Sequence, residues 1–311
     1  MKKIVCVLLF VALLASLSSC ALFKDNSEIR IGVMNGPTGM GMAKLVADAA
    51  ADENSNYSFE AYASPDLAIP ELTKGGIDML CLPTNTAATL SKKLDISVIA
   101  INCLGSLYLV TDENTSVNSI SDLEGKTIYC SVPNSTTVPI INYLLDEFNV
   151  NANVECVSDH DALVAKVVKN DVSIAVLPEP KASAALAQNN KYSVDLNLST
   201  EWSKVSEEPL TMGCIVVRNE YLKENRRTVE AFLKEYEASI NYIGNKDNID
   251  TAVSMITEAG IIPKAPIAKK ALNNLYGSIV YLDGKDMKSA LIAFYNAIGQ
   301  ELPDERFYYD K

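Results

Sequence analysis

From residue 29 onward, short apolar runs rich in Val and Ile alternate with segments whose apolar positions recur every three or four residues. The runs predict strands at 29–34, 57–63, 77–82, 96–103, 106–111, 127–130, 154–157, 173–177 and 211–217. The periodic segments predict helices at 38–51, 66–73, 84–91, 160–169, 227–243, 247–259, 265–276 and 285–299, one that ends at 148 and one opened by 178–180. A capping-box sequence occupies 121–124. This alternation indicates an α/β fold in which helices cover mostly parallel sheets.

The strand and helix pattern restarts after residue 105, which indicates two α/β units. The apolar strands at 106–111 and 211–217 bracket the second unit, so the chain crosses between the units twice, as in a hinge. We therefore predict one discontinuous lobe from residues 29–105 and 214–311, and a second lobe from residues 106–213. The helix-rich C-terminal third has no predicted sheet of its own and is expected to pack on one of the lobes.

The first 19 residues have the features of a signal peptide: two lysines, then an almost purely apolar run from residue 4 to 17. The run is too short to span a bilayer core of about 30 Å comfortably. Leu17-Ser18-Ser19-Cys20 resembles a bacterial lipobox, which predicts a lipid anchor on Cys20 and a polar tether at 20–28. The protein would then be held at the extracytoplasmic face of the cell membrane. The alternative is an ordinary signal peptide with an incidental cysteine.

Composition narrows the classes of function. Acidic residues exceed basic ones by 39 − 27 = 12, so no nucleic-acid partner is expected. His160 is the only histidine, which argues against multi-histidine metal sites and Ser-His or Cys-His catalysis, so no metal, other cofactor or enzyme activity is predicted. Asp159 and Asp161 favour the charged form of His160, which is expected to be solvated. Besides Cys20, the mature chain has five cysteines in or beside apolar runs, predicted to be buried free thiols.

Six segments resemble bacterial ABC-importer solute-binding lipoproteins, in the group that binds nitrate, alkanesulfonates, taurine and thiamine-pyrimidine precursors. The segments are 31–42, 76–85, 104–110, 122–126, 176–180 and 212–218, and the likeness covers essentially all of the mature chain. The resemblance implies a two-lobed fold of the type II periplasmic-binding-protein kind that closes on one small molecule. It also implies delivery of that ligand to a membrane permease driven by a separate ATPase, and we expect a monomer.

Open α/β sheets bind ligands off the carboxyl ends of their strands. The segments that follow the predicted strands place Gly, Pro, Ser, Thr and Asn at helix starts, where free backbone N–H groups favour an anionic or hydrogen-bond-accepting ligand group. The candidate ligand-binding residues are Asn35, Thr38, Gly39, Met40, Ser64, Thr84, Asn85, Asn134, Ser135, Thr136 and Glu179. For each polar residue in this set, the alternative is plain helix capping.

For the glycines, Met40 and Glu179, a structural role is the alternative to ligand binding. Gly36, Gly39 and Gly41 either let the backbone approach a ligand or form a tight turn, and they do not match a nucleotide-binding loop. Met40 either lines the cleft or belongs to the core. Glu179 is the one carboxylate predicted in the cleft, where it would suit an amine or an aminopyrimidine. The alternative is a solvated Glu179 that interacts with a helix dipole.

These observations favour a solute-binding lipoprotein whose ligand is an aminopyrimidine-like or other nitrogenous compound, or a sulfonate- or nitrate-type anion. One alternative is a ligand-sensing lipoprotein that signals to a receptor. Another is an enzyme on the same scaffold, similar to a pyrimidine synthase that sacrifices its own histidine and uses a cysteine-rich motif with iron. His160 is predicted at a surface cap, and no cysteine-rich motif occurs. Trp202 is expected to pack a loop onto the second lobe or to edge the cleft.

Overall fold

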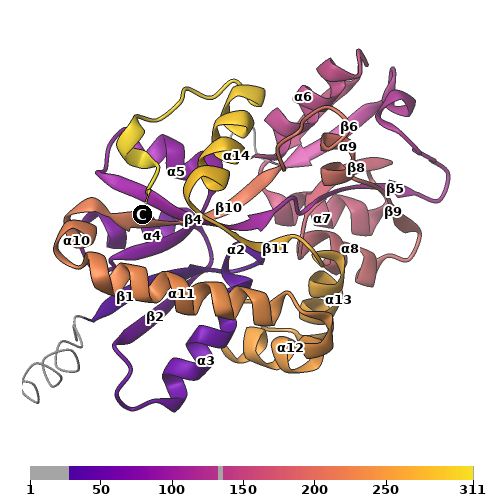
Figure 1. Ribbon diagram of the computed structural model, residues 1–311. Coiled ribbons are helices and arrows are strands. Elements are labelled where there is room, and N and C mark those ends of the chain that lie inside the picture. Colours follow the sequence, from indigo (N-terminus) through magenta and orange to yellow (C-terminus); the bar gives the residue numbers. More distant parts are fainter. Residues whose placement is uncertain (1–27, 132–135, 311) are drawn as a thin grey trace, which may run out of the picture.

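The computed structural model describes residues 28–131 and 136–310. Two β-sheets, each flanked by helices, lie next to one another, with the larger unit on the left of Figure 1 and the smaller on the right. The predicted α/β fold class is therefore confirmed. The predicted signal peptide and the lipid-anchor residue Cys20 lie outside the described residues.

The first sheet has six strands in the order β11-β4-β10-β3-β1-β2. They are β1 (Ile29–Met34), β2 (Tyr57–Tyr62), β3 (Met79–Pro83), β4 (Ile96–Leu104), β10 (Thr211–Arg218) and β11 (Ile279–Leu282). Strand β1 pairs in parallel with β2 and β3, whereas β10 runs antiparallel to β3 and β4, and β11 runs antiparallel to β4. The central strands β4 and β10 are almost entirely buried, which explains their nearly continuous apolar sequences.

The second sheet has five strands in the order β7-β6-β8-β5-β9. They are β5 (Leu107–Asp112), β6 (Thr127–Ser131), β7 (Asn153–Val157), β8 (Ile174–Pro178) and β9 (Tyr192–Asn197). Strand β6 pairs in parallel with β7 and β8, and β5 runs antiparallel to β8 and β9. Strand β7 forms one edge of this sheet, which leaves its side chains more exposed than those of β8.

Both sheets are mixed, whereas the alternation of elements predicts mostly parallel ones. The difference arises at the crossings between sheets. The chain leaves the first sheet at the end of β4, enters the second as β5 after two connecting residues, and returns to the first as β10. Crossover helices make parallel neighbours of consecutive strands in one sheet. Strands β5 and β10 each arrive from the other sheet, and they lie antiparallel to β8 and to β3.

The helices alternate with the strands as far as β8 and dominate the C-terminal third. The α-helices are α2 (Pro37–Met40), α3 (Ala43–Ala51), α4 (Pro65–Thr73), α5 (Thr84–Ser91), α6 (Thr137–Glu147), α7 (His160–Lys169), α8 (Lys181–Gln188), α9 (Leu198–Trp202), α10 (Asn219–Glu224), α11 (Arg226–Ile243), α12 (Ile249–Glu258), α13 (Ala265–Asn274) and α14 (Gly284–Ala297). Short 3-10 turns occur at η1 (Ile120–Leu123), η2 (Lys246–Asn248) and η3 (Glu305–Phe307). Across residues 28–131 and 136–310, no helix has the length and apolar character needed to cross a membrane.

Several local predictions differ from the structure. The segment 38–51, predicted as one helix, forms most of α2 and all of α3, and the short helices α9 and α10 have no counterpart among the predicted elements. Strands β9 and β11 were not predicted, because β9 carries several polar residues and β11 has only four residues. The capping box is formed by Ser119 and Asp122 and not at 121–124, so η1 begins earlier than the sequence indicated. Thr38 lies inside the short helix α2 and caps no helix, because Gly36 is the N-cap residue and Pro37 takes the first helical position.

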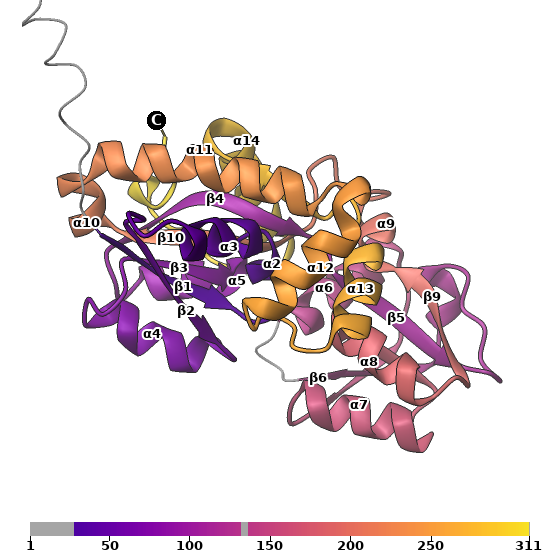
Figure 2. The same cartoon turned by 90° about the horizontal axis from the view of Figure 1, so that it is seen from below.

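The C-terminal third packs on the first sheet and also reaches the second unit. Helix α11 contacts α3 and β11, and α12 contacts both α3 and α13. Helix α13 in turn contacts α8 of the second unit, as Figure 2 shows. The expectation that this third packs on one lobe is therefore only partly correct.

The hydrophobic core continues from one unit into the other. Trp202 of α9 is 1% exposed, and its ring lies 4.9 Å from that of Tyr143 in α6 and 6.1 Å from that of Phe294 in α14, measured between centroids. Its indole N–H donates to the carbonyl oxygen of Glu208 at 2.9 Å. Trp202 therefore packs between helices of both units and does more than hold a loop onto the second one.

Candidate functional site

The β1–α2 turn of the first unit lies against the β8–α8 turn of the second. A Cβ atom added to Gly36 would be 3.6 Å from Cδ of Pro180, a van der Waals contact. Both turns follow the carboxyl ends of strands, at Met34 and Pro178. The carboxyl ends of the two sheets therefore face each other, and this is the edge at which open α/β sheets bind ligands.

The β1–α2 turn requires glycine at two positions. Gly36 has a φ of 96°, which side-chain-bearing residues rarely adopt, and its N–H donates to the carbonyl oxygen of Ile261 at 3.2 Å. A Cβ atom on Gly39 would lie 2.0 Å from the carbonyl oxygen of Met34. Asn35 is exposed and Thr38 is half-buried. The turn therefore leaves these two polar side chains accessible next to the second unit.

Two candidate residues take part in packing. Met40 is fully buried in the core together with Met42, as in the core alternative for Met40. Thr84 is also fully buried, and its hydroxyl donates to the carbonyl oxygen of Thr211 at 3.2 Å. The Tyr295 hydroxyl donates to the carbonyl oxygen of Thr84 at 3.0 Å. These side chains are not exposed to solvent in this conformation.

Other candidate residues lie at helix starts but make no capping bond. Ser64 is the N-cap residue of α4 and Thr136 is that of α6, and neither side chain caps its helix. Asn85 lies in the first turn of α5, where its Oδ1 accepts a long hydrogen bond of 3.5 Å from Thr86. Plain capping therefore does not account for these polar side chains. Asn134 and Ser135 lie outside the described residues.

Glu179 is only 2% exposed and lies directly after β8. Its backbone N–H donates to the carbonyl oxygen of Ser106 at 2.9 Å. Its carboxylate accepts hydrogen bonds from the Ser183 N–H at 3.3 Å, the Ser183 hydroxyl at 3.0 Å and the Asn274 amide at 2.6 Å. The alternative of a solvated carboxylate at the start of α8 therefore does not apply.

Asn274, the last residue of α13, connects the C-terminal segment to the second sheet. Its side chain binds Glu179, and its carbonyl oxygen accepts a hydrogen bond of 2.7 Å from the Tyr108 hydroxyl. Burial raises the pKa of Tyr108, so the hydroxyl remains a donor at neutral pH. No local sequence pattern marks Asn274 or Tyr108 as a functional residue, and Asn274 is 95 residues from Glu179 in the chain.

At the carboxyl end of β6, the Ser131 hydroxyl and Nδ1 of His160 form a hydrogen bond. His160 opens α7, and Lys181 of α8 forms an ion pair of 2.5 Å with Asp161. Burial, followed by the positive charge of Lys181, lowers the pKa of His160 in spite of Asp161 and Asp159. His160 lies at the start of α7 as expected but is half-buried and not solvated; the flanking carboxylates do favour its charged form, and burial outweighs them.

Beneath α2, two buried oxygens of the described residues have no hydrogen-bond partner: Oδ1 of Asn102 and Oγ1 of Thr211. A Cβ atom on Gly213 would lie 2.6 Å from Oδ1 of Asn102 and 2.9 Å from Oγ1 of Thr38. The glycine therefore lets Thr38 and Asn102 approach each other over β10. A buried acceptor without a donor is costly, so a water or ligand N–H would be favourable there. The signal in the sequence is an amide, Asn102, near the end of the apolar run at 96–103, whose other polar residue, Ser97, lies near its start.

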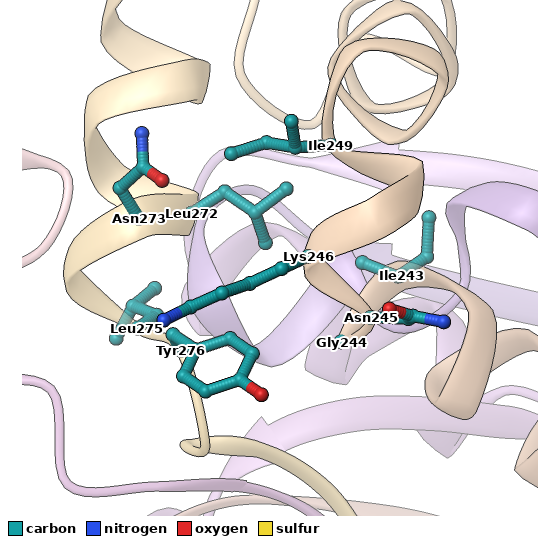
Figure 3. Close-up of a pocket in the computed structure, with 9 residues that line it drawn as sticks. All are labelled: Ile243, Gly244, Asn245, Lys246, Ile249, Leu272, Asn273, Leu275 and Tyr276. Carbon is teal, nitrogen blue, oxygen red and sulfur yellow. The ribbon is translucent and has the colours of Figure 1, made fainter.

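Three cavities among the described residues lie away from the contact between the β1–α2 and β8–α8 turns. Figure 3 shows an apolar pocket between α11 and α13, where Nζ of Lys246 lies 3.8 Å from the ring centroid of Tyr276. Its volume of about 10 Å³ holds one water molecule at most. Cavities of about 340 and 390 Å³ lie beside Ile96 and Thr127, at the amino ends of β4 and β6. That edge is opposite to the one at which α/β sheets bind ligands.

No group of three or more His, Cys, Asp and Glu side chains that could hold a metal occurs in the described part of the chain. Cys81, Cys103, Cys130 and Cys214 are buried thiols, as predicted, and burial raises the pKa of Cys81 and Cys103 to about 12. Cys156 is exposed, so the prediction is wrong for this residue. The reason is its place on the edge strand β7.

Comparison with solved structures confirms the expected likeness to ABC-importer binding proteins at the level of the fold. An ABC transporter structure from Parabacteroides distasonis has 22% identity and a TM-score of 0.75, over 92% of this chain and 99% of that one. The periplasmic aliphatic sulphonate binding protein of Escherichia coli has 14% identity and a TM-score of 0.70, over 90% and 96%. The periplasmic nitrate-binding protein of Synechocystis PCC 6803 has 12% identity and a TM-score of 0.59, over 84% and 74%.

Sequence comparison adds a different description. No curated protein matches the chain. A family model described as menaquinone biosynthesis matches residues 58–300 of the 311. The matched region includes most of both sheets, together with Glu179, His160 and Asn274. The chain therefore belongs to this menaquinone biosynthesis family, and its fold is that of the periplasmic binding proteins of ABC importers.

Proposed function

We propose that this protein is an extracytoplasmic solute-binding protein of an ABC importer, which holds one small molecule between its two units and passes it to a membrane permease driven by an ATPase. The observation that carries the proposal is the contact of the Gly36 and Pro180 turns, which sets the carboxyl ends of both sheets against each other. The shared fold with binding proteins for sulphonates and nitrate supports it.

We propose that the two units are lobes, with residues 29–105 and 214–311 in one and 106–213 in the other. The lobes would move about the crossings between β4 and β5 and before β10. Contacts such as Asn274 with Glu179 and Phe294 with Trp202 would then join the lobes in the closed form. Selectivity would come from polar groups of both lobes that enclose the ligand and exclude water.

We propose that the mature protein is a lipoprotein. Residues 1–19 would be removed, Cys20 would carry the lipid, and residues 20–28 would tether the lobes to the extracytoplasmic face of the membrane. The lipobox-like Leu17-Ser18-Ser19-Cys20 supports this assignment. The protein would act as a monomer, and its outer faces would bind the permease.

The proposed ligand is a small polar molecule, either an aminopyrimidine-like or other nitrogenous compound or a sulfonate- or nitrate-type anion. The carboxylate of Glu179 already accepts three hydrogen bonds from Ser183 and Asn274, so an amine would have to replace the Asn274 amide to reach it. An anion would instead use the backbone and hydroxyl donors near Asn35, Thr38 and Thr136.

A thermal-shift screen tests the proposal. The chain from residue 21 would be unfolded and refolded to remove bound ligand, then mixed with sulfonates, nitrate, thiamine and its pyrimidine, polyamines and amino acids. A ligand at 1,000 times its Kd stabilises by about 4 kcal/mol, which shifts the unfolding midpoint by several degrees. The emission of Trp202, which contacts both units, should change with the same ligand. If no compound shifts the midpoint and the untreated protein carries no small molecule, the binding function is wrong.

The family match favours a second candidate, an enzyme of menaquinone biosynthesis. The hydrogen bond between Ser131 and a His160 whose pKa is lowered supports it, because a neutral imidazole can accept a proton. The two functions differ in the fate of the ligand. Mass spectrometry of the stabilising compound after incubation should recover it unchanged if the protein is a binding protein. Conversion to a product that a His160→Gln variant no longer forms would establish the enzyme.

A further inference from the structure

Two cysteines of the second sheet lie directly opposite each other on neighbouring strands. Cys130 of β6 and Cys156 of β7 are Cα partners in the parallel ladder, between the pairs Tyr129–Glu155 and Ser131–Val157. Neighbouring strands lie about 4.8 Å apart, and disulfides join Cα atoms that are about 4.4–6.8 Å apart. The ladder therefore places the two backbones within the range that a disulfide spans.

The two side chains also point to the same face of the sheet. Side chains alternate along a strand, so Ile128 and Cys130 share one face of β6, and Val154 and Cys156 share the corresponding face of β7. Packing supports this assignment. Ile128, Cys130 and Val154 belong to one hydrophobic cluster, whereas Tyr129 packs on the other side of the sheet.

Cys156 is exposed and Cys130 is buried, so Cys156 would react first with an oxidant. Cys156 is exposed on the edge strand, so a small oxidant can reach it. Cys130 is buried, and burial raises its pKa to about 12, which makes it a poor first nucleophile. The other described cysteines, Cys81, Cys103 and Cys214, are buried in the first sheet, and none of them is the ladder partner of another.

We propose that Cys130 and Cys156 are a modification site, a cross-strand thiol pair that small-molecule disulfides oxidise to a disulfide. The Cys156 thiolate attacks one sulfur of the small disulfide and forms a mixed disulfide, and the departing thiolate takes up the proton that Cys156 lost. Cys130 then gives its proton to solvent and attacks the Cys156 sulfur, which releases the second thiol. Two protein thiols are oxidised, and one small disulfide is reduced to two thiols.

The bond would join the edge strand β7 to the strand that carries Ser131, the hydrogen-bond partner of His160. It would close the loop from 130 to 156, which contains helix α6. Cross-linking a loop of this length restricts the unfolded chain and so stabilises the native state. Cys130 directly precedes Ser131, at the carboxyl end of β6. The inference does not depend on which solute, if any, binds near that end of the strand.

Peptide mapping of the full chain tests the proposal. The protein would be treated with glutathione disulfide, unfolded, alkylated and cut after glutamate, which separates the two cysteines at Glu147 and Glu155. We expect a linked pair of peptides containing Cys130 and Cys156, absent after reduction. We also expect the thermal unfolding midpoint to rise by roughly 5–10 °C on oxidation.

A Cys156→Ser variant removes the exposed thiol from an edge strand, where loss of folding is not expected. This variant should show neither the linked peptides nor the rise in midpoint, whereas the matched Cys103→Ser variant should show both. The proposal is wrong if oxidised Cys156 is recovered only with glutathione or with a second copy of the chain, while Cys130 is alkylated. It is also wrong if Cys130 and Cys156 are both fully alkylated after oxidation.

Discussion

The hydrogen bond between Asn274 and Glu179 should contribute measurable stability, and a double-mutant cycle can isolate it. Asn274→Ala removes an amide that donates to the Glu179 carboxylate at 2.6 Å and to the Ser183 hydroxyl at 3.3 Å. The bond from the Tyr108 hydroxyl goes to the backbone of residue 274 and is retained. A buried hydrogen bond to a charged group contributes about 1.5–3 kcal/mol, so the Glu179→Ala and Asn274→Ala effects should couple by that amount.

The assay is urea unfolding of the parent, both single variants and the double variant, followed by the fluorescence of Trp202 and by circular dichroism. The matched control pairs Glu179→Ala with Asn273→Ala, since Asn273 is an exposed asparagine on the same helix. Its coupling energy should stay within about 0.5 kcal/mol, as for residues that do not interact. A coupling that small for Asn274 as well would refute the view that this contact joins α13 to the second sheet.

Three further predictions follow from single contacts. Gly39→Ala should destabilise the protein strongly or prevent folding, because the new methyl group would lie 2.0 Å from the Met34 carbonyl oxygen. Unfolding followed by circular dichroism measures the loss of stability. Phe294→Ala should cost about 3–5 kcal/mol and shift the emission of Trp202, and an unchanged spectrum would contradict their contact. The folded state lowers the pKa of His160 below its usual 6.5, so the free energy of unfolding should fall as the pH drops below about 6.5. Urea titrations of a His160→Gln variant should show a weaker dependence of stability on pH.

The sequence was a good guide to local structure. The strands β1, β4 and β10 and the helices α4, α5 and α11 lie within one or two residues of their predicted bounds. Such elements depend on the spacing of apolar side chains and on turn residues that are near in the chain. Ser64 and Pro65, for example, take the N-cap and first helical positions of α4, directly before the helix predicted at 66–73. The two-lobed fold was expected only because six sequence segments resemble ABC-importer solute-binding lipoproteins.

The candidate site was harder to predict, because its residues come from distant parts of the chain. The sequence named the turns after β1 and β8 as candidate ligand-binding segments, whereas their contact at Gly36 and Pro180 depends on the tertiary structure. The sequence left open whether Met40 lines the cleft or belongs to the core, and the tertiary packing places it in the core. Asn102 is a member of the candidate site only because its strand, β4, contacts helix α2.

By itself, the sequence determined the α/β class, the order of most elements and the acidic, single-histidine composition, since these depend on nearest neighbours or on counting. Only the tertiary structure decided the mixed direction of the sheets, the burial of Glu179 and the lowered pKa of His160. Each of these depends on which distant segments pack together. Burial and hydrogen bonding set the state of a polar group, and both come from neighbours that are far away in the chain.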